Sequence, residues 1–131
     1  VMHYRNQTAK TQQFINITNR VAEAVRSSDV RDGIVVIYVP HTTAGVTINE
    51  NADPDVVRDI ITTLDKTYPV NGDYLHLEGN SHAHIKASLM GSSCTVIIED
   101  GKLLLGTWQG IYFCEFDGPR NREFYVKVVK G

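Results

Sequence analysis

Residues 34–41 read Ile-Val-Val-Ile-Tyr-Val-Pro-His, and this stretch decides the character of the fold. Six apolar or aromatic residues in succession are typical of a strand that is covered on both faces. Pro40 ends the strand because proline has no N–H to donate to a ladder. His41 therefore follows directly on a rigid core strand, and we expect its side chain to be held firmly at the edge of the core.

The segments on either side switch between periods of two and 3.6 residues, which predicts an α+β domain. Strands are expected near residues 2–8, 12–17, 45–49, 95–99, 102–105, 109–116 and 124–129. Helices are expected over residues 18–27, 54–68 and 83–90. Tight turns join most of the strands, so we expect a mixed, largely antiparallel sheet or sandwich of about seven to eight strands with two to three helices.

Local patterns add detail to the first two helices. The hydroxyl of Thr18 is expected to cap the first, and Asp53 followed by Pro54 is expected to begin the second. In the second helix, apolar residues recur from Val56 to Leu64 at positions i, i+1, i+4, i+5 and i+8. This stripe predicts that one helical face packs on the sheet.

Length and charge limit the classes of function. With 131 residues, the chain is expected to form one domain over residues 1–131. Its net charge of -2 and the lack of a basic block argue against nucleic-acid binding. No stretch is long and apolar enough to span a membrane, and the first residues lack the pattern of a signal peptide. We therefore expect a cytoplasmic location, where Cys94 and Cys114, which sit in apolar runs without a CxxC partner, would be buried free thiols, with a disulfide between them as the alternative.

Four histidines fall in polar stretches: His41, His76, His82 and His84. Imidazoles from three segments can form an open tetrahedral site for zinc or a related divalent ion. His82 and His84 would share a face on an extended segment but diverge on a helix, and the sequence leaves both geometries open. A hydrogen-bonded or exposed imidazole without a metal is the alternative for each of them.

Other polar residues suit acid–base work or anion binding. Glu50 follows a strand and is a candidate general base, whereas Asp53 is better explained as a helix cap. Trp108 and Gln109 lie between two glycines, which fits a core position, a subunit interface or a close backbone approach. Hydroxyl and cationic side chains that suit phosphate are Thr42, Thr43, Lys86, Ser88, Arg120 and Arg122.

Three ordered motifs cover nearly the whole chain. The first spans residues 41–54 (HTTAGVTINENADP), and the second spans residues 74–91 (YLHLEGNSHAHIKASLMG). The third joins residues 101–111 (GKLLLGTWQGI) to residues 115–120 (EFDGPR). Together they resemble the YjbQ-like family.

The resemblance implies a small α+β domain that forms a homotrimer with sites near subunit interfaces. It also implies secondary thiamine-phosphate synthase activity, in which hydroxymethylpyrimidine diphosphate and thiazole phosphate give thiamine phosphate and pyrophosphate. Carried over by motif, the metal ligands would be His41, His76 and His84. The catalytic residues would be Thr42, Thr43, Asn49, Glu50 and Gln109. The substrate- and anion-binding residues would be Lys86, Ser88, Trp108 and Arg120.

The expected cofactor is a divalent metal ion, with zinc favoured by the histidines and magnesium as the alternative. The expected partner is a phosphorylated small molecule. Loss of pyrophosphate usually needs Mg²⁺ held by carboxylates, and the chain lacks an acidic cluster of that kind. A metal-dependent hydrolase or lyase therefore stays open as an alternative, as does a non-catalytic trimeric binding module for a metal or phosphorylated metabolite.

Overall fold

Two antiparallel sheets and three helices make up the computed structural model, which describes residues 1–131. The larger sheet has the order β1 (Met2–Gln7), β8 (Asn121–Lys130), β3 (Asp32–Tyr38), β5 (Ser93–Glu99) and β6 (Lys102–Leu103). The smaller sheet has the order β2 (Gln13–Asn16), β7 (Gln109–Glu115) and β4 (Ala44–Glu50). The helices are α1 (Thr18–Ser28), α2 (Pro54–Thr67) and α3 (Ser81–Met90). The predicted α+β class with about eight strands is confirmed.

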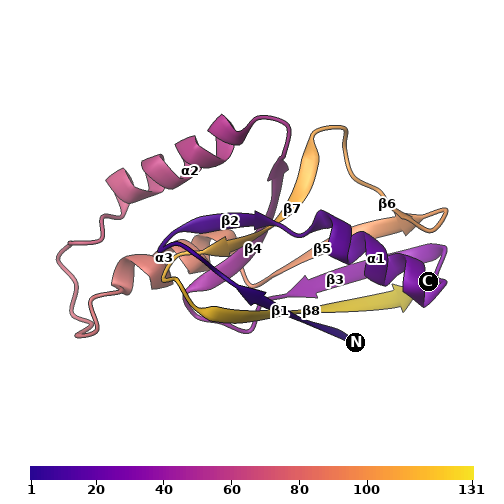
Figure 1. Ribbon diagram of the computed structural model, residues 1–131, viewed down its shortest axis with the longest axis horizontal. Helices are drawn as coiled ribbons and strands as arrows, with labels where there is room; N and C mark the ends of the chain where they lie inside the picture. Colours follow the sequence, from indigo (N-terminus) through magenta and orange to yellow (C-terminus); the bar gives the residue numbers. More distant parts are fainter.

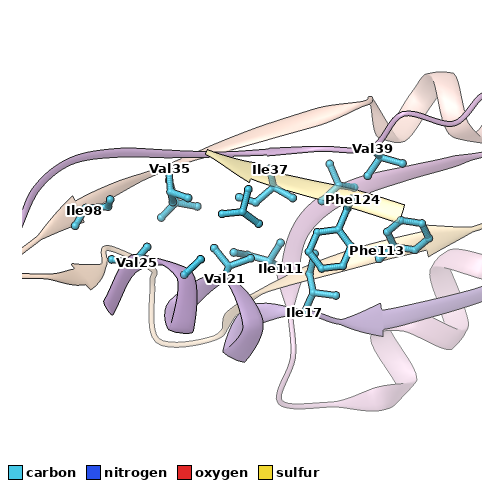
Figure 2. Close-up of a cluster of buried hydrophobic side chains, with 14 of the residues drawn as sticks. Ile17, Val21, Val25, Val35, Ile37, Val39, Ile98, Ile111, Phe113 and Phe124 are labelled. Atoms are coloured by element: carbon cyan, nitrogen blue, oxygen red, sulfur yellow. The ribbon is translucent and has the colours of Figure 1, made fainter. Parts of the chain in front are cut away.

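The main core lies between the larger sheet on one side and α1 with the smaller sheet on the other. Figure 2 shows Val35 and Ile37 of β3 facing Val21 of α1, with Phe113 of β7 and Phe124 of β8 at one end of the cluster. Only alternate residues of β3 are fully buried, so the outer face of this strand is not covered as the apolar run predicted. The strand nevertheless lies in the middle of its sheet, and His41 follows it as expected.

A second, smaller core lies beneath α3. Ala83 and Ala87 of α3 pack on Tyr112 and Cys114 of β7. The backbone of α3 also comes close to β4, because a Cβ atom on Gly45 would lie 2.7 Å from the carbonyl oxygen of Gly91. The small side chains therefore fix α3, and the residues at its start, against the smaller sheet.

The expected helix starts are confirmed in one case and wrong in the other. The Asp53 carboxylate caps α2 by accepting a hydrogen bond of 2.9 Å from the N–H of Asp55. The Thr18 hydroxyl makes no cap and instead accepts a hydrogen bond from the N–H of Ile111 while donating to Asn16. The Thr18 hydroxyl thus serves a tertiary contact with β7 instead of the helix cap that the local sequence predicted.

Helix α2 departs from its predicted packing. Figure 1 shows it lying apart from both sheets and close to the loop that leads to α3. No residue of α2 is buried, and of its apolar stripe Val57 and Leu64 reach the core beneath α3. The prediction that this face packs on a sheet is confirmed only for Val57 and Leu64, which contact a cluster that includes Tyr112 and Cys114 of β7. None of the three helices has the length and apolar character needed to cross a bilayer.

Candidate functional site

A polar cavity of about 420 Å³ lies where the turn after β3 meets the loop before α3 and the turn before β8. We call it the histidine cavity. It is lined by Pro40, His41, Thr42, Thr43, His76, Glu78, Asn80, His84, Asp117, Arg120 and Arg122. Segments far apart in sequence therefore converge here, and they bring together all three histidines that were expected to act jointly.

His41 is oriented by the neighbouring strand. Its Nε2 atom accepts a hydrogen bond of 2.9 Å from the backbone N–H of Glu123 in β8. Burial lowers the pKa of His41, and the positive charge of Arg122 lowers it further. A neutral imidazole has one proton, so acceptance at Nε2 places that proton on Nδ1. In this form His41 offers a ligand an N–H donor and has no free lone pair for a metal.

His76 and His84 form a close pair in the same cavity. Their ring centroids are 5.4 Å apart and the ring planes are nearly perpendicular, at 89°. Neither imidazole makes a hydrogen bond within the chain, so both are available to a ligand or an ion. No group of three or more histidine, cysteine or acidic side chains is close enough together to hold a metal. The three predicted ligands thus share one cavity, but two of them form the close pair.

His82 points the other way from His84, as expected for residues two apart on a helix. It is buried, and its Nδ1 atom accepts a hydrogen bond of 3.0 Å from the Nζ atom of Lys86. Lys86 is itself 0% exposed, and its ammonium also donates to Asp65 at 2.5 Å and to Gln12 at 3.2 Å. Lys86 lies outside the histidine cavity, and its charge is already paired with the carboxylate of Asp65 in α2.

The floor of the histidine cavity contains a buried ion pair. Arg122 of β8 donates from Nε to Glu115 at 2.8 Å and also pairs with the second oxygen of that carboxylate. Burial by itself raises the pKa of Glu115, but hydrogen bonds from Arg122, Thr8 and the N–H of Asp117 outweigh it and hold the pKa below its usual range. Arg122 also donates to the Thr43 hydroxyl at 2.8 Å, which fixes a predicted site residue.

A second polar link closes the rim. Asp117 accepts hydrogen bonds from the Asn80 amide at 2.8 Å and from the Arg120 guanidinium at 3.0 Å. Burial raises the pKa of Asp117, but these two hydrogen bonds outweigh it, so the group stays ionised. The loop before α3 is thereby joined to the turn before β8. Arg120, which was predicted to bind an anion, lines the cavity, and its Nε and Nη2 atoms already donate to Asp117.

Comparison with known proteins gives the family. A model of the UPF0047 protein YjbQ-like family matches residues 2–131. This chain belongs to the YjbQ/UPF0047 family. A UPF0047 protein of Methanocaldococcus jannaschii is 61% identical over 96% of this chain and 91% of its own length. The UPF0047 protein YugU of Bacillus subtilis is 51% identical over 93% of each chain.

Solved structures from the same family share the fold. An uncharacterized YjbQ/UPF0047 protein from Clostridium acetobutylicum superposes with a TM-score of 0.98, at 65% identity over 98% of this chain and 100% of that one. A protein of unknown function from Sulfolobus solfataricus gives a TM-score of 0.95 at 31% identity, over 99% of this chain and 96% of that one. The expected family and fold are confirmed, and the names of these relatives carry no activity.

In this YjbQ-family chain most of the predicted site residues fall into two groups that lie apart. Six of them line the histidine cavity: His41, Thr42, Thr43, His76, His84 and Arg120. Ser88 lines an adjoining pocket of about 510 Å³ and donates to the carbonyl of His84. Asn49, Glu50, Trp108 and Gln109 lie at the far end of β4 and β7, where Glu50 pairs with Gln109. Because β4 has seven residues, at roughly 3.3 Å each, its two ends are about 20 Å apart.

Four residues of the histidine cavity were not part of the site predicted from the sequence. Glu78, Asn80 and Asp117 line the cavity without having been assigned a role there, and Arg122 had been named only as a possible anion holder. Arg122 had a signal, because the period of two in β8 places it on the same face as buried Phe124. A buried arginine side chain is normally paired with an opposite charge and hydrogen-bonded, so this position called for a partner. The other three lie in turns and loops, where periodicity carries no information.

Both cysteines are unpaired, as expected. Burial raises the pKa of the Cys94 thiol to about 11 and raises that of Cys114 further still. The thiolate is the nucleophilic form, so neither group is reactive at neutral pH. The cysteines of this YjbQ-family chain therefore serve packing.

Proposed function

We propose that this protein is a small metabolic enzyme that acts on a phosphorylated small molecule bound at the histidine cavity. The observation that carries the proposal is the convergence of three imidazoles with the guanidiniums of Arg120 and Arg122 in a cavity without apolar side chains other than Pro40. Imidazoles transfer protons near neutral pH, and guanidiniums suit phosphate oxygens. His41 would donate through Nδ1–H, and His76 or His84 would act as the general base.

A divalent metal ion is part of the proposal, zinc first and magnesium as the alternative. Two carboxylates, Glu78 and Asp117, line the cavity together with its two arginines, and Glu115 compensates Arg122 from below. An anionic substrate therefore needs additional positive charge. Protonated imidazoles would supply it, as would a metal at the His76–His84 pair, which would polarise a bound oxygen. His41 fits such a metal poorly because its Nε2 atom is already an acceptor.

The specific reaction that the family resemblance implies is thiamine-phosphate synthesis. The polar lining supports a metal-assisted hydrolase or lyase of another phosphorylated substrate at least as well, because the part of the cavity that one chain supplies offers two heterocyclic rings no apolar wall. A non-catalytic trimeric module that binds a metal or phosphorylated metabolite is the second candidate. It is favoured because many polar contacts orient the side chains of the cavity, while no nucleophile is exposed there.

A homotrimer would complete the site. Leu75 and Leu77 flank His76 and are 98% and 99% exposed, and Trp108 is 62% exposed. Apolar side chains that are exposed together, as Leu75 and Leu77 are, suit a surface that a partner covers. We expect a neighbouring copy to cover them and to bring its Asn49, Glu50, Trp108 and Gln109 toward the histidine cavity. This assembly would reunite the two groups that β4 holds apart within one chain.

Metal content and turnover test the proposal together. Elemental mass spectrometry on untagged protein should find about one zinc per chain in the wild type and much less in His84→Ala. Thiamine-phosphate formation and phosphate release from a panel of phosphorylated metabolites should fall in the same variant. Full metal content and full turnover in His41→Ala, His76→Ala and His84→Ala would show that the cavity is not the site. Ligand-dependent stabilisation without turnover would favour the binding module.

Mixing variants tests the composite site. Inactive His84→Ala and inactive Glu50→Gln protein are unfolded and refolded together, so that mixed trimers form. If one copy supplies the histidines and the next supplies Glu50, part of the activity returns, because some interfaces combine two intact halves. A mixture that stays inactive, despite mixed trimers in native mass spectrometry, would show that neighbouring copies do not combine the histidines of one chain with Glu50 of the next.

A further inference from the structure

The pocket that Ser88 lines, of about 510 Å³, meets the histidine cavity along α3. His41, Thr42 and His84 line both spaces, so the two adjoin at these side chains. Ser88 and Ser92 line only the second space, and with Thr42 they give it three hydroxyl side chains. We call this space the hydroxyl pocket. Its volume falls within the roughly 300–1,000 Å³ that is typical of small-molecule sites.

One face of α3 forms a wall of the hydroxyl pocket. His84, Ala87 and Ser88 lie at positions i, i+3 and i+4 of the helix, so their side chains project on the same side. Gly91 follows the helix, and a Cβ atom placed on it would meet no atom within 4 Å. Ala44 of β4 also lines the pocket. Alanine and glycine therefore leave room here that longer side chains would fill.

The two spaces differ in charge. The histidine cavity contains two arginines and two carboxylates, whereas no lysine, arginine, aspartate or glutamate lines the hydroxyl pocket. Guanidiniums suit phosphate oxygens, and Arg120 and Arg122 supply them in the histidine cavity. Apart from the imidazoles that it shares with that cavity, the hydroxyl pocket has no charge to offer. It therefore suits an uncharged group.

The hydroxyl pocket has hydrogen-bonding groups that are free to meet a ligand. Thr42 and Ser92 are exposed, and their hydroxyls make no hydrogen bond within the chain. Ser88 donates to the carbonyl oxygen of His84 at 2.9 Å, which leaves its own oxygen able to accept. No apolar side chain larger than alanine lines the pocket. This lining favours hydroxyl and carbonyl groups over an apolar ring.

We infer that the hydroxyl pocket holds the uncharged part of the substrate while the phosphate lies in the histidine cavity. This inference rests on the proposed function and names its substrate class, a phosphomonoester whose organic part is small and rich in hydroxyl or carbonyl oxygens. His41 and His84 stand where the two parts join, because they line both spaces. Ala87 and Ser88 limit the size of the organic part.

Variants that fill the hydroxyl pocket test the inference on the full chain. Ser88→Leu and Ser92→Leu each add bulk at an exposed position, one on α3 and one just after it. NMR titrations measure the binding of inorganic phosphate and of ribose 5-phosphate. Ribose 5-phosphate should bind the wild type at least about tenfold more tightly than phosphate, and its Kd should rise by at least about tenfold in the filled variants. The Kd of phosphate should change by less than about threefold, because neither serine lines the histidine cavity.

Ser27→Leu is the matched control. Ser27 is an exposed serine of helix α1 and lines neither space, so its replacement should change neither Kd. Thermal unfolding checks that each variant is folded. Because Ser88 and Ser92 belong to different elements, either filled variant alone decides the outcome.

The other outcomes separate this inference from the proposed function. Ribose 5-phosphate that binds no more tightly than phosphate, or equally well to the wild type and the filled variants, would overturn the inference and leave the proposed function intact. An equal loss for both ligands would place the phosphate itself in the hydroxyl pocket and overturn the division between the two spaces. Tighter binding of phenyl phosphate than of ribose 5-phosphate would overturn the oxygen-rich substrate class. Absence of binding by all three, with or without zinc, would overturn the proposed function as well.

Discussion

The imidazole of His41 is held by the backbone of Glu123, across a distance of 2.9 Å from N–H to Nε2. The contact joins the turn after β3 to β8, and it assigns the neutral form of His41 to the Nδ1–H tautomer. A backbone donor cannot be removed by a side-chain substitution. The orientation of this histidine is therefore a property of the sheet rather than of a neighbouring side chain.

The tautomer of His41 is the first prediction. Long-range nitrogen–proton NMR spectra at pH 7.5 should show His41 neutral and protonated at Nδ1, because burial and Arg122 both lower its pKa. Glu123→Ala keeps the backbone N–H and should leave the tautomer unchanged. An Nε2–H signal for His41 in the wild type would contradict the hydrogen bond and restore this residue as a metal ligand.

Stability should fall in mildly acidic solution. The pKa values of His41 and His82 are lowered in the folded protein, mainly by burial, whereas both groups ionise near about 6.5 in the unfolded chain. The unfolded state then binds more protons, so the free energy of unfolding is complete above that pH and is lost as the pH falls through the folded pKa values. Urea unfolding at pH 7.5, 6.5 and 5.5 measures the slope. His82→Gln should reduce it, and a flat wild-type profile would contradict the prediction.

The ion pair beneath the cavity should be essential to folding. Arg122→Met leaves Glu115 buried and ionised, and breaking a buried pair in this way costs about 3–5 kcal/mol. Arg122→Met combined with Glu115→Leu should recover much of that loss, since no unpaired charge remains. Urea unfolding of the two proteins checks this. Equal stability of the single and double variants would mean that Glu115 reaches water or a proton.

The polar link between α2 and α3 should be asymmetric. Asp65 is partly exposed and can turn to water when Lys86 is removed, whereas Lys86 is fully buried and cannot. Asp65→Asn is therefore expected to destabilise by about 1–3 kcal/mol and Lys86→Met by less. Thermal and urea unfolding give the comparison. A larger loss in Lys86→Met would show that His82 and Gln12 depend on the ammonium more than α2 does.

Assembly should depend on the two open leucines. Leu75→Ser with Leu77→Ser removes side chains that touch little within the chain, so the helix content and core packing should be unchanged. If a second copy covers them, light scattering should show a shift from trimer to monomer as the protein is diluted. Lys10→Ser, which replaces an exposed polar side chain in place of the two leucines, is the control. Identical masses for the double variant and the wild type would place the subunit contact elsewhere.

How far the sequence predicted the site depended on the kind of position. His41, Thr42 and Thr43 were found because they follow a recognisable core strand, and that strand holds them at the cavity. Glu50 was grouped with them because it stands in the same motif, and Gln109 because the family resemblance implied it. Strand β4 then carries Glu50 to the opposite end of the sheet, which no local pattern could show.

The sequence by itself determined the fold class, the position of most strands and helices, and the family. Periodicity, caps and turns depend on residues that are close together in the sequence, so they can be predicted from it. Only the tertiary structure decided which polar groups meet: Arg122 with Glu115, Lys86 with Asp65, and His76 with His84. Such contacts join residues that are distant along the chain, and burial then fixes the charge and hydrogen-bond partners of each.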